Sequence, residues 1–343
     1  MKKIIQIPVI IIITILLAEI TFRIYNKINP SFIFPTNTYD RFRGRPFEKV
    51  YDYKLNSKGF MDLEYSEEKK TGVYRILGVG DSFVFGMVPY KYNFMTILEE
   101  KLNNHRNRKY EVINMGIPCI GVDSYYSLLL NEGLKLKPDM VICCFFVGND
   151  FIERWEQNAG KRSYLISFLR FIFKIYPKYS GMKGKYVDRT FNDEDVSLYM
   201  TEPVFLKLEE DRSAIFRKGI NKELEFVTLY LNKMNDTCVS KGIKFLVVII
   251  PDELQVNPRL QEKFASFLSV KSLSGKYDFG RPNELLHFEL EKLNINYLDL
   301  LSNFMKVSVD KDYYKKNDTH WNMAGNKLAT ELIFDKLEKE YVK

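Results

Sequence analysis

The sequence predicts an α/β fold in which helices cover both faces of a five-stranded parallel sheet, giving three layers. Short, almost wholly apolar runs alternate with segments of helical spacing, and turn residues such as Gly, Pro, Asn and Asp follow the runs. Apolar runs of this length are typical of strands that are buried on both faces. The alternation predicts parallel pairing, and five strands favour the flavodoxin-like order, with the third strand beside the first.

The expected elements follow one another along the chain. The apolar runs predict strands at residues 74–79, 110–113, 140–147, 244–250 and 296–300. Apolar residues at helical spacing predict helices from Ser82 to about residue 102, up to Gly133, from Ile220 to Gly242, twice between the fourth and fifth strands, and from Met323 to about residue 341. The α/β part of the chain is therefore expected to span residues 72–343.

Composition narrows the function classes. Of the 343 residues, 46% are apolar and 28% are charged, which are globular values. The net charge of +7 is spread out and includes no compact run of Lys and Arg, so we expect no nucleic-acid partner. The four cysteines show neither metal-ligand nor disulfide spacing, and the adjacent Cys143 and Cys144 are expected to be buried in a strand. We expect no metal ion and no cofactor.

The N-terminal residues 1–27 are expected to be a signal anchor outside the fold. Lys2 and Lys3 precede an apolar stretch at 4–22, which is interrupted by Gln6, Pro8, Thr14, Glu19 and Thr21. A bilayer span needs about 20 apolar residues, so the stretch is marginal in length. No Ala-x-Ala-like cleavage site follows, which favours an uncleaved, single-pass transmembrane helix. The charges that flank the helix are nearly balanced, and the very short N-terminal tail favours the remaining chain outside the cytoplasm.

A lead-in at residues 28–71 follows the anchor, and we expect a short hairpin at 51–61 with its turn at residues 56–59. The alternation of strands and helices stops again at an insertion, residues 151–217. Within it, residues 163–179 are apolar and aromatic, and Arg170, Lys174 and Lys178 would form one basic stripe on a helix. This pattern fits an interfacial helix or lid, or a helix packed on its own domain. Residues 181–215 are expected to be irregular.

Polar or small residues follow four of the predicted strands, namely Ser82, Gly116, Asn149 and Asp252. The carboxyl ends of parallel strands share one rim, where open α/β sheets bind ligands. With the third strand beside the first, Ser82 and Asn149 are expected to face each other. Asp81 is expected to shape the turn before Ser82.

A hydrolytic serine needs a base, and the chain has three histidines. His105 is expected in a solvated loop and His287 on the surface of a charged helix. His320 lies between the last strand and the last helix, at the correct rim and beside an acid. Two other loop motifs are incomplete in this sequence. Phe83 stands in place of the third glycine of a dinucleotide-binding fingerprint, and Val84 stands in place of the second glycine of a nucleophile elbow.

Four short blocks carry a family resemblance over about residues 72–341. In order and spacing, the sequence resembles the SGNH hydrolases, or GDSL superfamily, in the blocks Gly80-Asp81-Ser82-Phe83, Asn114-Met115-Gly116, Gly148-Asn149-Asp150 and Asp318-Thr319-His320. The anchor and the lead-in are similar to those of membrane-anchored bacterial members.

The resemblance implies specific roles. Ser82 would be the nucleophile and His320 the general base. The backbone N–H groups of Ser82 and Gly116 and the side-chain amide of Asn149 would form the oxyanion hole. The common family pattern places the acid three residues before the histidine, where this chain has Asn317. We assign Asp318 as the acid, at the shorter spacing.

The expected function is that of a membrane-anchored serine esterase that acts through an acyl-serine intermediate on an acylated carbohydrate or lipid. An O-acetyltransferase of envelope glycans is the alternative. A carbohydrate-binding protein without catalysis is a third hypothesis, against which the joint presence of Ser82, Asn149 and His320 argues.

Overall fold

The computed structural model of the chain describes residues 2–28, 39, 43–50, 53–105, 108–151, 163–173, 200–217 and 220–341. The chain divides into two compact units. One comprises Met1–Phe42 with Glu153–Ser180, and the other comprises Arg43–Ile152 with Gly181–Lys343. The larger unit holds the sheet, and the smaller one holds the N-terminal helix with part of the insertion.

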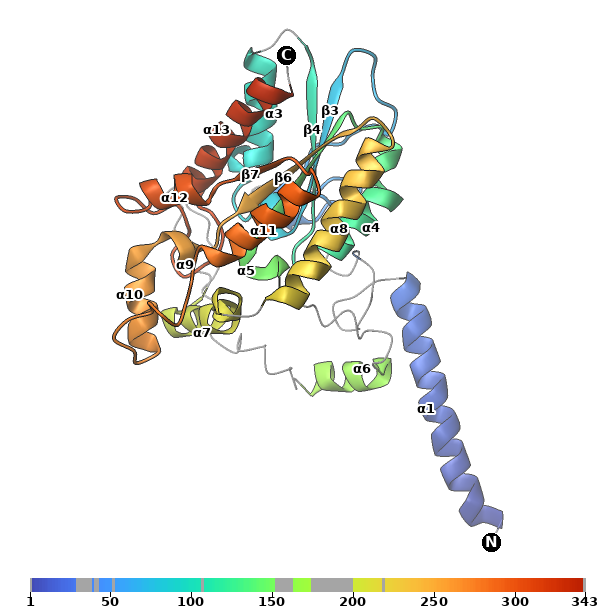
Figure 1. Ribbon diagram of the computed structural model, residues 1–343. Helices are drawn as coiled ribbons and strands as arrows, with labels where there is room; N and C mark the ends of the chain where they lie inside the picture. Colours follow the sequence, from blue (N-terminus) through green and yellow to red (C-terminus); the bar gives the residue numbers. More distant parts are fainter. Residues whose placement is uncertain are drawn as a thin grey trace. The chain divides into compact units, whose positions relative to one another are not determined.

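The larger unit contains the predicted five-stranded parallel sheet (Figure 1). Its strands are β3 (Tyr74–Gly80), β4 (Tyr110–Gly116), β5 (Met140–Phe146), β6 (Lys244–Ile250) and β7 (Tyr297–Asp299). The order β4-β3-β5-β6-β7 places the third strand beside the first, and every neighbouring pair is parallel. The flavodoxin-like order is therefore confirmed.

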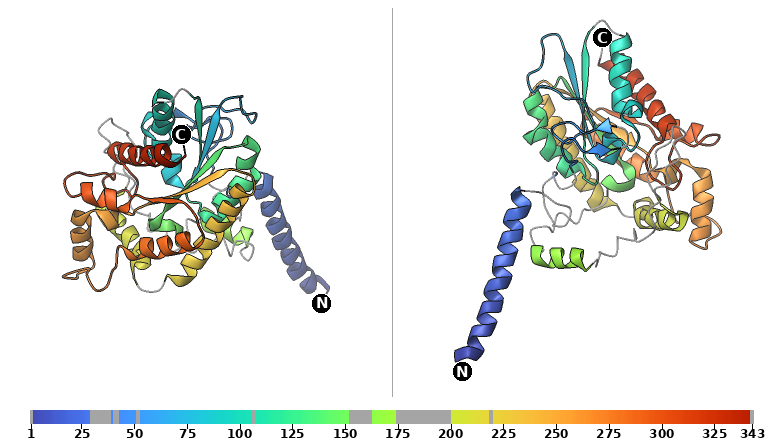
Figure 2. Two further views of the ribbon diagram at one scale, coloured as in Figure 1. Left: turned by 45° about the horizontal axis from the view of Figure 1, so that its top comes forward. Right: turned by 180° about the vertical axis from the view of Figure 1, so that it is seen from behind.

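Helices cover both faces of this sheet. α3 (Phe94–His105), α12 (Leu301–Val307) and α13 (Met323–Glu340) lie on one side, and α4 (Val122–Asn131), α8 (Asn221–Val239) and α11 (Arg281–Lys292) on the other (Figures 1 and 2). Successive strand residues point to opposite faces, so Cys144 joins the core under α13 while Cys143 faces the other layer. Both are fully buried, as expected.

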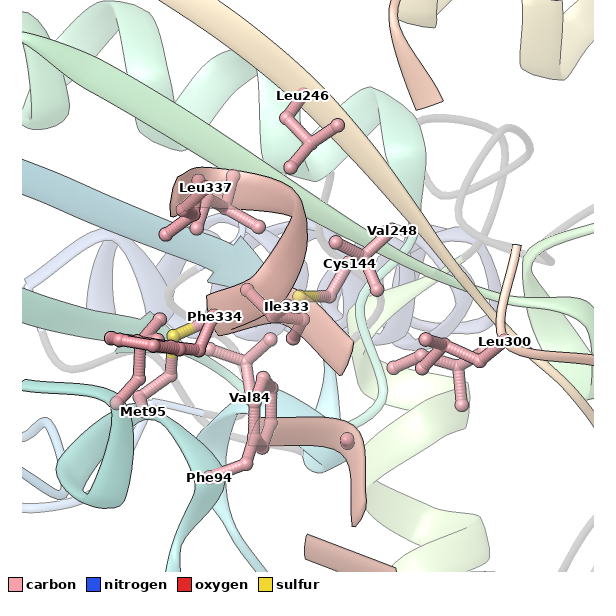
Figure 3. Packing of buried hydrophobic residues seen from close by; sticks show 14 of the residues in the cluster. Val84, Phe94, Met95, Cys144, Leu246, Val248, Leu300, Ile333, Phe334 and Leu337 are labelled. Carbon is pink, nitrogen blue, oxygen red and sulfur yellow. The ribbon is translucent and has the colours of Figure 1, made fainter. Parts of the chain in front are cut away.

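The core between the sheet and α3 and α13 is apolar throughout its centre. Figure 3 shows Val84, Phe94, Met95 and Cys144 packed against Ile333, Phe334 and Leu337 of α13, with Leu246, Val248 and Leu300 close by. Trp321 closes the same core beside the rim. Its ring stacks on Phe304 at 5.2 Å and meets Phe83 edge-on at 5.0 Å. The residues flanking Ser82 and His320 are thus fixed in one aromatic cluster.

The helix expected from Ser82 is broken, contrary to the prediction. α2 (Ser82–Phe85) ends after one turn, a 3₁₀ turn spans Tyr90–Tyr92, and α3 begins only at Phe94. Gly86 stops α2 with φ of 89°. Asn93 then donates its side-chain amide to the carbonyls of Val84 and Phe85. These contacts satisfy the end of α2 without continuing the helix.

The predicted hairpin is displaced in the structure. β1 (Lys49–Val50) pairs antiparallel with β2 (Tyr53–Lys54), so the hairpin precedes the expected turn. Residues 56–59 form a separate turn in which Asn56 Oδ1 accepts from the N–H groups of Lys58 and Phe60. Because Asn56 bonds its own loop, the segment does not continue as a strand.

The insertion also differs from the prediction. The stretch 181–215, expected to be irregular, contains α7 (Glu202–Arg212) followed by a 3₁₀ turn at Ser213–Phe216. Both lie in the larger unit and bury polar and apolar side chains together. The short helices α9 (Glu253–Val256) and α10 (Pro258–Phe267) follow β6. Residues 152–162 and 174–199, including Lys174 and Lys178 of the expected basic stripe, lie outside the described residues.

The smaller unit contains α1 (Lys2–Ile28) and α6 (Tyr164–Ile172). Within α1, Ile7–Asn26 is long and apolar enough to cross a membrane, with a mean hydropathy of 2.3. A membrane anchor and a signal peptide both fit this length and composition. α6 occupies the part of the insertion for which an amphipathic helix was predicted.

Candidate active site

Ser82 lies where the central strand β3 ends and α2 begins. Asp81 caps α2, because its carboxylate accepts the Phe83 N–H at 2.9 Å. The apolar run of β3 is buried throughout, and it ends at Gly80 next to β4 and β5. The serine therefore starts a short helix at the carboxyl rim of the sheet, in a half-buried position.

His320 and Asp318 complete a hydrogen-bonded chain with this serine. Ser82 Oγ lies 2.8 Å from His320 Nε2, and His320 Nδ1 lies 2.5 Å from Asp318 Oδ1. The Asp318 side chain is 2% exposed, and that of His320 is 15% exposed. Although burial by itself raises the pKa of Asp318, the adjacent His320 and Lys315 hold it below its usual value. The carboxylate thus stays charged beside the ring.

The loop before α13 holds His320 in this orientation. The His320 carbonyl accepts the Lys315 N–H at 2.9 Å, and the His320 N–H donates to Asp318 Oδ1 at 3.1 Å. Asn317 adopts a left-handed conformation with φ of 54°. In this turn Asp318 contacts the ring and Asn317 does not. An imidazole between a hydroxyl and a carboxylate can accept the hydroxyl proton and return it.

Asn149 lies beside Ser82, across the β3–β5 boundary, in the one-turn helix α5 (Val147–Asp150). Its side-chain Nδ2 donates to Asp81 Oδ2 at 3.0 Å. One hydrogen of the amide is therefore fixed on a fully buried carboxylate, which leaves the second hydrogen for another acceptor. Asn149 Oδ1 has no hydrogen-bond partner among the described residues.

Gly116 lies at the end of β4, packed against α2. Its N–H donates to Asn114 Oδ1 at 2.9 Å. A Cβ at this position would lie 2.0 Å from the Phe85 nitrogen, so the residue is packed against the backbone of α2. This N–H is thus engaged inside the fold, and the role of Gly116 as an oxyanion donor stays a prediction.

A buried charge cluster lies behind Asn149. Arg212 of α7 donates Nε to the Gly148 carbonyl at 3.1 Å and pairs with Asp252 and Glu209. A Cβ on Gly148 would lie 2.2 Å from Asp252 Oδ2 and 2.3 Å from Arg212 Nη2, so the cluster needs a glycine there. Burial raises the pKa of Glu209 well above its usual value despite the opposing charge of Arg212. The cluster joins the insertion to the residue preceding Asn149.

The other two histidines lie apart from this chain of contacts. His105 ends α3, rather than lying in a loop, and its Nδ1 contacts the Lys101 carbonyl at 2.9 Å. His287 is not a simple surface residue. Its Nε2 lies 2.7 Å from Asp299 Oδ2, and its ring stacks on Tyr297 at 4.8 Å. Across the described part of the chain, no group of three His, Cys, Asp or Glu residues could hold a metal ion.

Comparison with known families supports the resemblance seen in the sequence. Residues 214–342, which include His320 and Asp318, match the family model described as an SGNH hydrolase-like domain of the acetyltransferase AlgX. Residues 214–342 match an SGNH hydrolase-like domain. The expected membership of the SGNH superfamily is thereby confirmed. No curated protein sequence matches the chain significantly.

Solved structures similar to this chain include three that are named as an esterase or a lipase. An acetyl xylan esterase is 12% identical, with a TM-score of 0.44, and the match covers 77% of this chain and 99% of that one. A lipase/acylhydrolase from Enterococcus faecalis is 14% identical, with a TM-score of 0.43 and coverage of 78% and 96%. A catalytic mutant of an acetylxylan esterase from Geobacillus stearothermophilus is 11% identical, with a TM-score of 0.45 and coverage of 79% and 96%.

Two features of the site were not found from the sequence. Asp81 was expected only to shape a turn, yet it also holds the Asn149 amide, which is 68 positions away. No local spacing reveals such a pair. Arg212 lies in a segment that was expected to be irregular. The Glu209–Arg212 spacing of three, which places both side chains on one helix face, was the available signal.

Proposed function

We propose that the chain is a serine esterase that cleaves ester bonds through an acyl intermediate on Ser82. The hydrogen-bonded chain from Ser82 through His320 to Asp318 is the observation that carries the proposal. A hydroxyl is a weak nucleophile unless a base is in contact with it. His320 is the one histidine in contact with a serine hydroxyl among the described hydrogen bonds. The family match supports acyl-ester chemistry in general.

In the proposed first step, Ser82 Oγ attacks the ester carbonyl carbon, and its proton moves to His320 Nε2. Charged Asp318 stabilises the resulting imidazolium. The Asn149 amide and the Ser82 N–H donate to the oxyanion that forms. The carbon–oxygen bond to the alcohol then breaks, and His320 gives its proton to the departing alkoxide.

In the second step an acceptor hydroxyl attacks the acyl-serine and loses its proton to His320. The tetrahedral intermediate collapses, the acyl group leaves on the acceptor, and His320 returns the proton to Ser82 Oγ. Water as acceptor gives hydrolysis, whereas a sugar hydroxyl gives O-acyl transfer. The family model's description as an acetyltransferase favours transfer to a glycan as the second candidate function.

The proposal is tested with p-nitrophenyl acetate. We expect the full chain to release p-nitrophenol, and Ser82→Ala to lose that activity. Ser127→Ala in α4 is the matched control, because Ser127 bonds only its own helix, at the Asp123 carbonyl, and it should retain full activity. Equal turnover by Ser82→Ala and wild type would contradict the proposal.

A second assay distinguishes the two acceptors. Acetyl release from the same ester is followed with and without an oligosaccharide. Acetylated sugar in the presence of the oligosaccharide indicates a transferase, and free acetate at an unchanged rate indicates an esterase. The two outcomes share the acyl-serine step, so Ser82→Ala must abolish either product.

A further inference from the structure

The apolar side chains of α1 are exposed along the segment Ile7–Asn26. Ile7, Ile10 and Leu17 are each about 60% exposed, and the buried residue of the segment is the polar Asn26 at its end. Exposed apolar surface on every side of a helix is stable only in an apolar surrounding. This helix nevertheless carries one acidic residue, Glu19, within the segment.

The Glu19 carboxylate accepts hydrogen bonds at the N-terminus of α6. It accepts the N–H groups of Tyr164 and Leu165, both at 3.0 Å, and the Ser163 hydroxyl at 2.8 Å. These are among the groups that every helix leaves unsatisfied at its N-terminus. Arg23, one turn further along α1, pairs with the same carboxylate at 2.8 Å. A carboxylate that is costly in a membrane span is thus satisfied by an element about 145 residues later in the chain.

Ring contacts fix the same junction. The Arg23 guanidinium lies 4.6 Å from the centre of the Tyr164 ring, and the Phe22 and Phe168 rings are 4.4 Å apart. Glu19 lies seven residues before Asn26, the end of the apolar segment, which is about 10 Å along a helix. With Asn26 at the level of the headgroups, α6 would begin at the depth at which amphipathic helices enter a lipid interface, about 5–10 Å.

The side of α6 that does not contact α1 is also apolar. Ile166, Leu169 and Ile172 are 52%, 41% and 51% exposed, and exposed Arg170 lies beside them. An apolar face with a cationic rim matches the acyl boundary and the phosphates of a phospholipid surface.

We propose that α1 and α6 form one membrane-bound unit, in which α6 lies in the lipid headgroup interface and Glu19 of the retained anchor caps it. The occupant of the exposed α6 face is a phospholipid bilayer. A cleaved signal peptide would take Glu19 and Arg23 away from α6, so the mature protein keeps α1. The proposal is independent of the catalytic role of Ser82.

Depth-dependent fluorescence quenching tests the proposal on the full chain in phosphatidylcholine–phosphatidylglycerol vesicles. Cys119, the one exposed cysteine of four, is replaced by serine, and a fluorophore is attached to Ile166→Cys. A lipid nitroxide near the headgroup should quench this probe at least twofold. Phe288→Cys in α11, which is 65% exposed, is the matched control and should not be quenched. Equal quenching at both sites, or none at residue 166, overturns the proposal.

Two further measurements complete the test. Glu19→Ala should lower quenching at residue 166 at least twofold while the protein stays bound to vesicles through α1. Glu19→Gln, which keeps one acceptor oxygen, should lie between alanine and wild type, and unchanged quenching in both variants overturns the role of Glu19. An N-terminal epitope should remain on the membrane-bound chain, and its loss during expression overturns retention of α1. If the fluorophore at residue 166 is shielded from water equally in detergent and in vesicles but is not quenched by the lipid nitroxide, then protein covers α6. This result also overturns the proposal.

Discussion

Asp81→Asn separates the capping role of Asp81 from its contact with Asn149. In the wild type, one Asp81 oxygen accepts the Phe83 N–H and the other accepts Asn149 Nδ2 at 3.0 Å. Asparagine caps a helix about as well as aspartate. Its amide nitrogen would, however, face the amide nitrogen of Asn149. The relaxed arrangement rotates the Asn149 amide by a half turn, so that Oδ1, which has no hydrogen-bond partner among the described residues, accepts from residue 81.

The rotation replaces a donor by an acceptor beside Ser82. Losing one oxyanion donor typically lowers kcat by about 10²–10³-fold, or about 2.7–4 kcal/mol of transition-state stabilisation. The rotation exchanges the unpartnered Asn149 Oδ1 for an unpartnered Nδ2. The number of unpartnered polar atoms does not rise, so the free energy of unfolding should change by less than about 0.5 kcal/mol. The variant is therefore expected to fold as well as wild type and to be nearly inactive.

The assay combines ester-hydrolysis kinetics with urea unfolding. Asp81→Ala is the comparison, since it also removes the cap and should lose about 0.5–2 kcal/mol of stability. The double variant Asp81→Asn with Asn149→Ala should be no slower than Asn149→Ala alone, because both changes remove the same donor. A value of kcat for Asp81→Asn within twofold of wild type would refute the reasoning that Asp81 orients a catalytic amide.

Three other predictions concern neighbouring groups. Asp318→Asn should lower kcat about 10³–10⁴-fold through the wrong ring tautomer. Asn317→Gly, which removes the side chain and keeps the left-handed turn, should change kcat little; the reverse order in steady-state kinetics would reassign the acid. Arg212→Met leaves Asp252 buried without its cation and should lower the free energy of unfolding in urea by about 3–5 kcal/mol. Adding Asp252→Asn should recover most of this loss, and no recovery would indicate a purely steric role of Arg212. Burial raises the pKa of Asp62 from 3.8 to about 7, so folding takes up a proton at this carboxyl group. The contribution of this proton to the free energy of unfolding is complete below pH 4 and is lost as pH rises to 7, by up to about 1.4 kcal/mol per pH unit. Asp62→Asn should flatten that slope, and parallel wild-type and variant curves of unfolding free energy against pH would contradict the assignment.

Buried strands were the most predictable part of the fold. Their apolar runs are bounded by turn residues, and the observed β6 has the predicted ends at residues 244 and 250. Burial on both faces leaves little choice of residue, so the pattern is strong. The edge strand β7 is only partly buried, and it is shorter than predicted.

Local hydrogen bonds explain the main errors. Asn56 accepts hydrogen bonds from backbone N–H groups of its own turn, which ends one expected strand. Asn93 donates to backbone carbonyls at the end of α2, which ends one expected helix. Apolar spacing carries no information about such contacts. α7 was missed because its inward face includes Glu209 and Arg212, which resemble a solvated surface until their partner Asp252 is known.

The choice of the candidate histidine could be predicted from the order of elements along the chain and from the chemistry of the side chains. Elimination among three histidines selected His320, because only that one follows the last strand. The contact between Asp318 and the ring depends on the left-handed turn at Asn317, which spacing alone does not reveal. The engaged Gly116 N–H follows from the Asn114 side chain two residues earlier, and a strand pattern does not show where that side chain points.

Covalent labelling with a fluorophosphonate tests the central claim, that Ser82 is a nucleophile activated by His320. The full chain in detergent is treated with the probe, and the modified peptide is identified by mass spectrometry. We predict one adduct per chain, on Ser82, which is absent in Ser82→Ala and formed much more slowly in His320→Ala. An unlabelled wild type, or an adduct that persists in Ser82→Ala, would contradict the account.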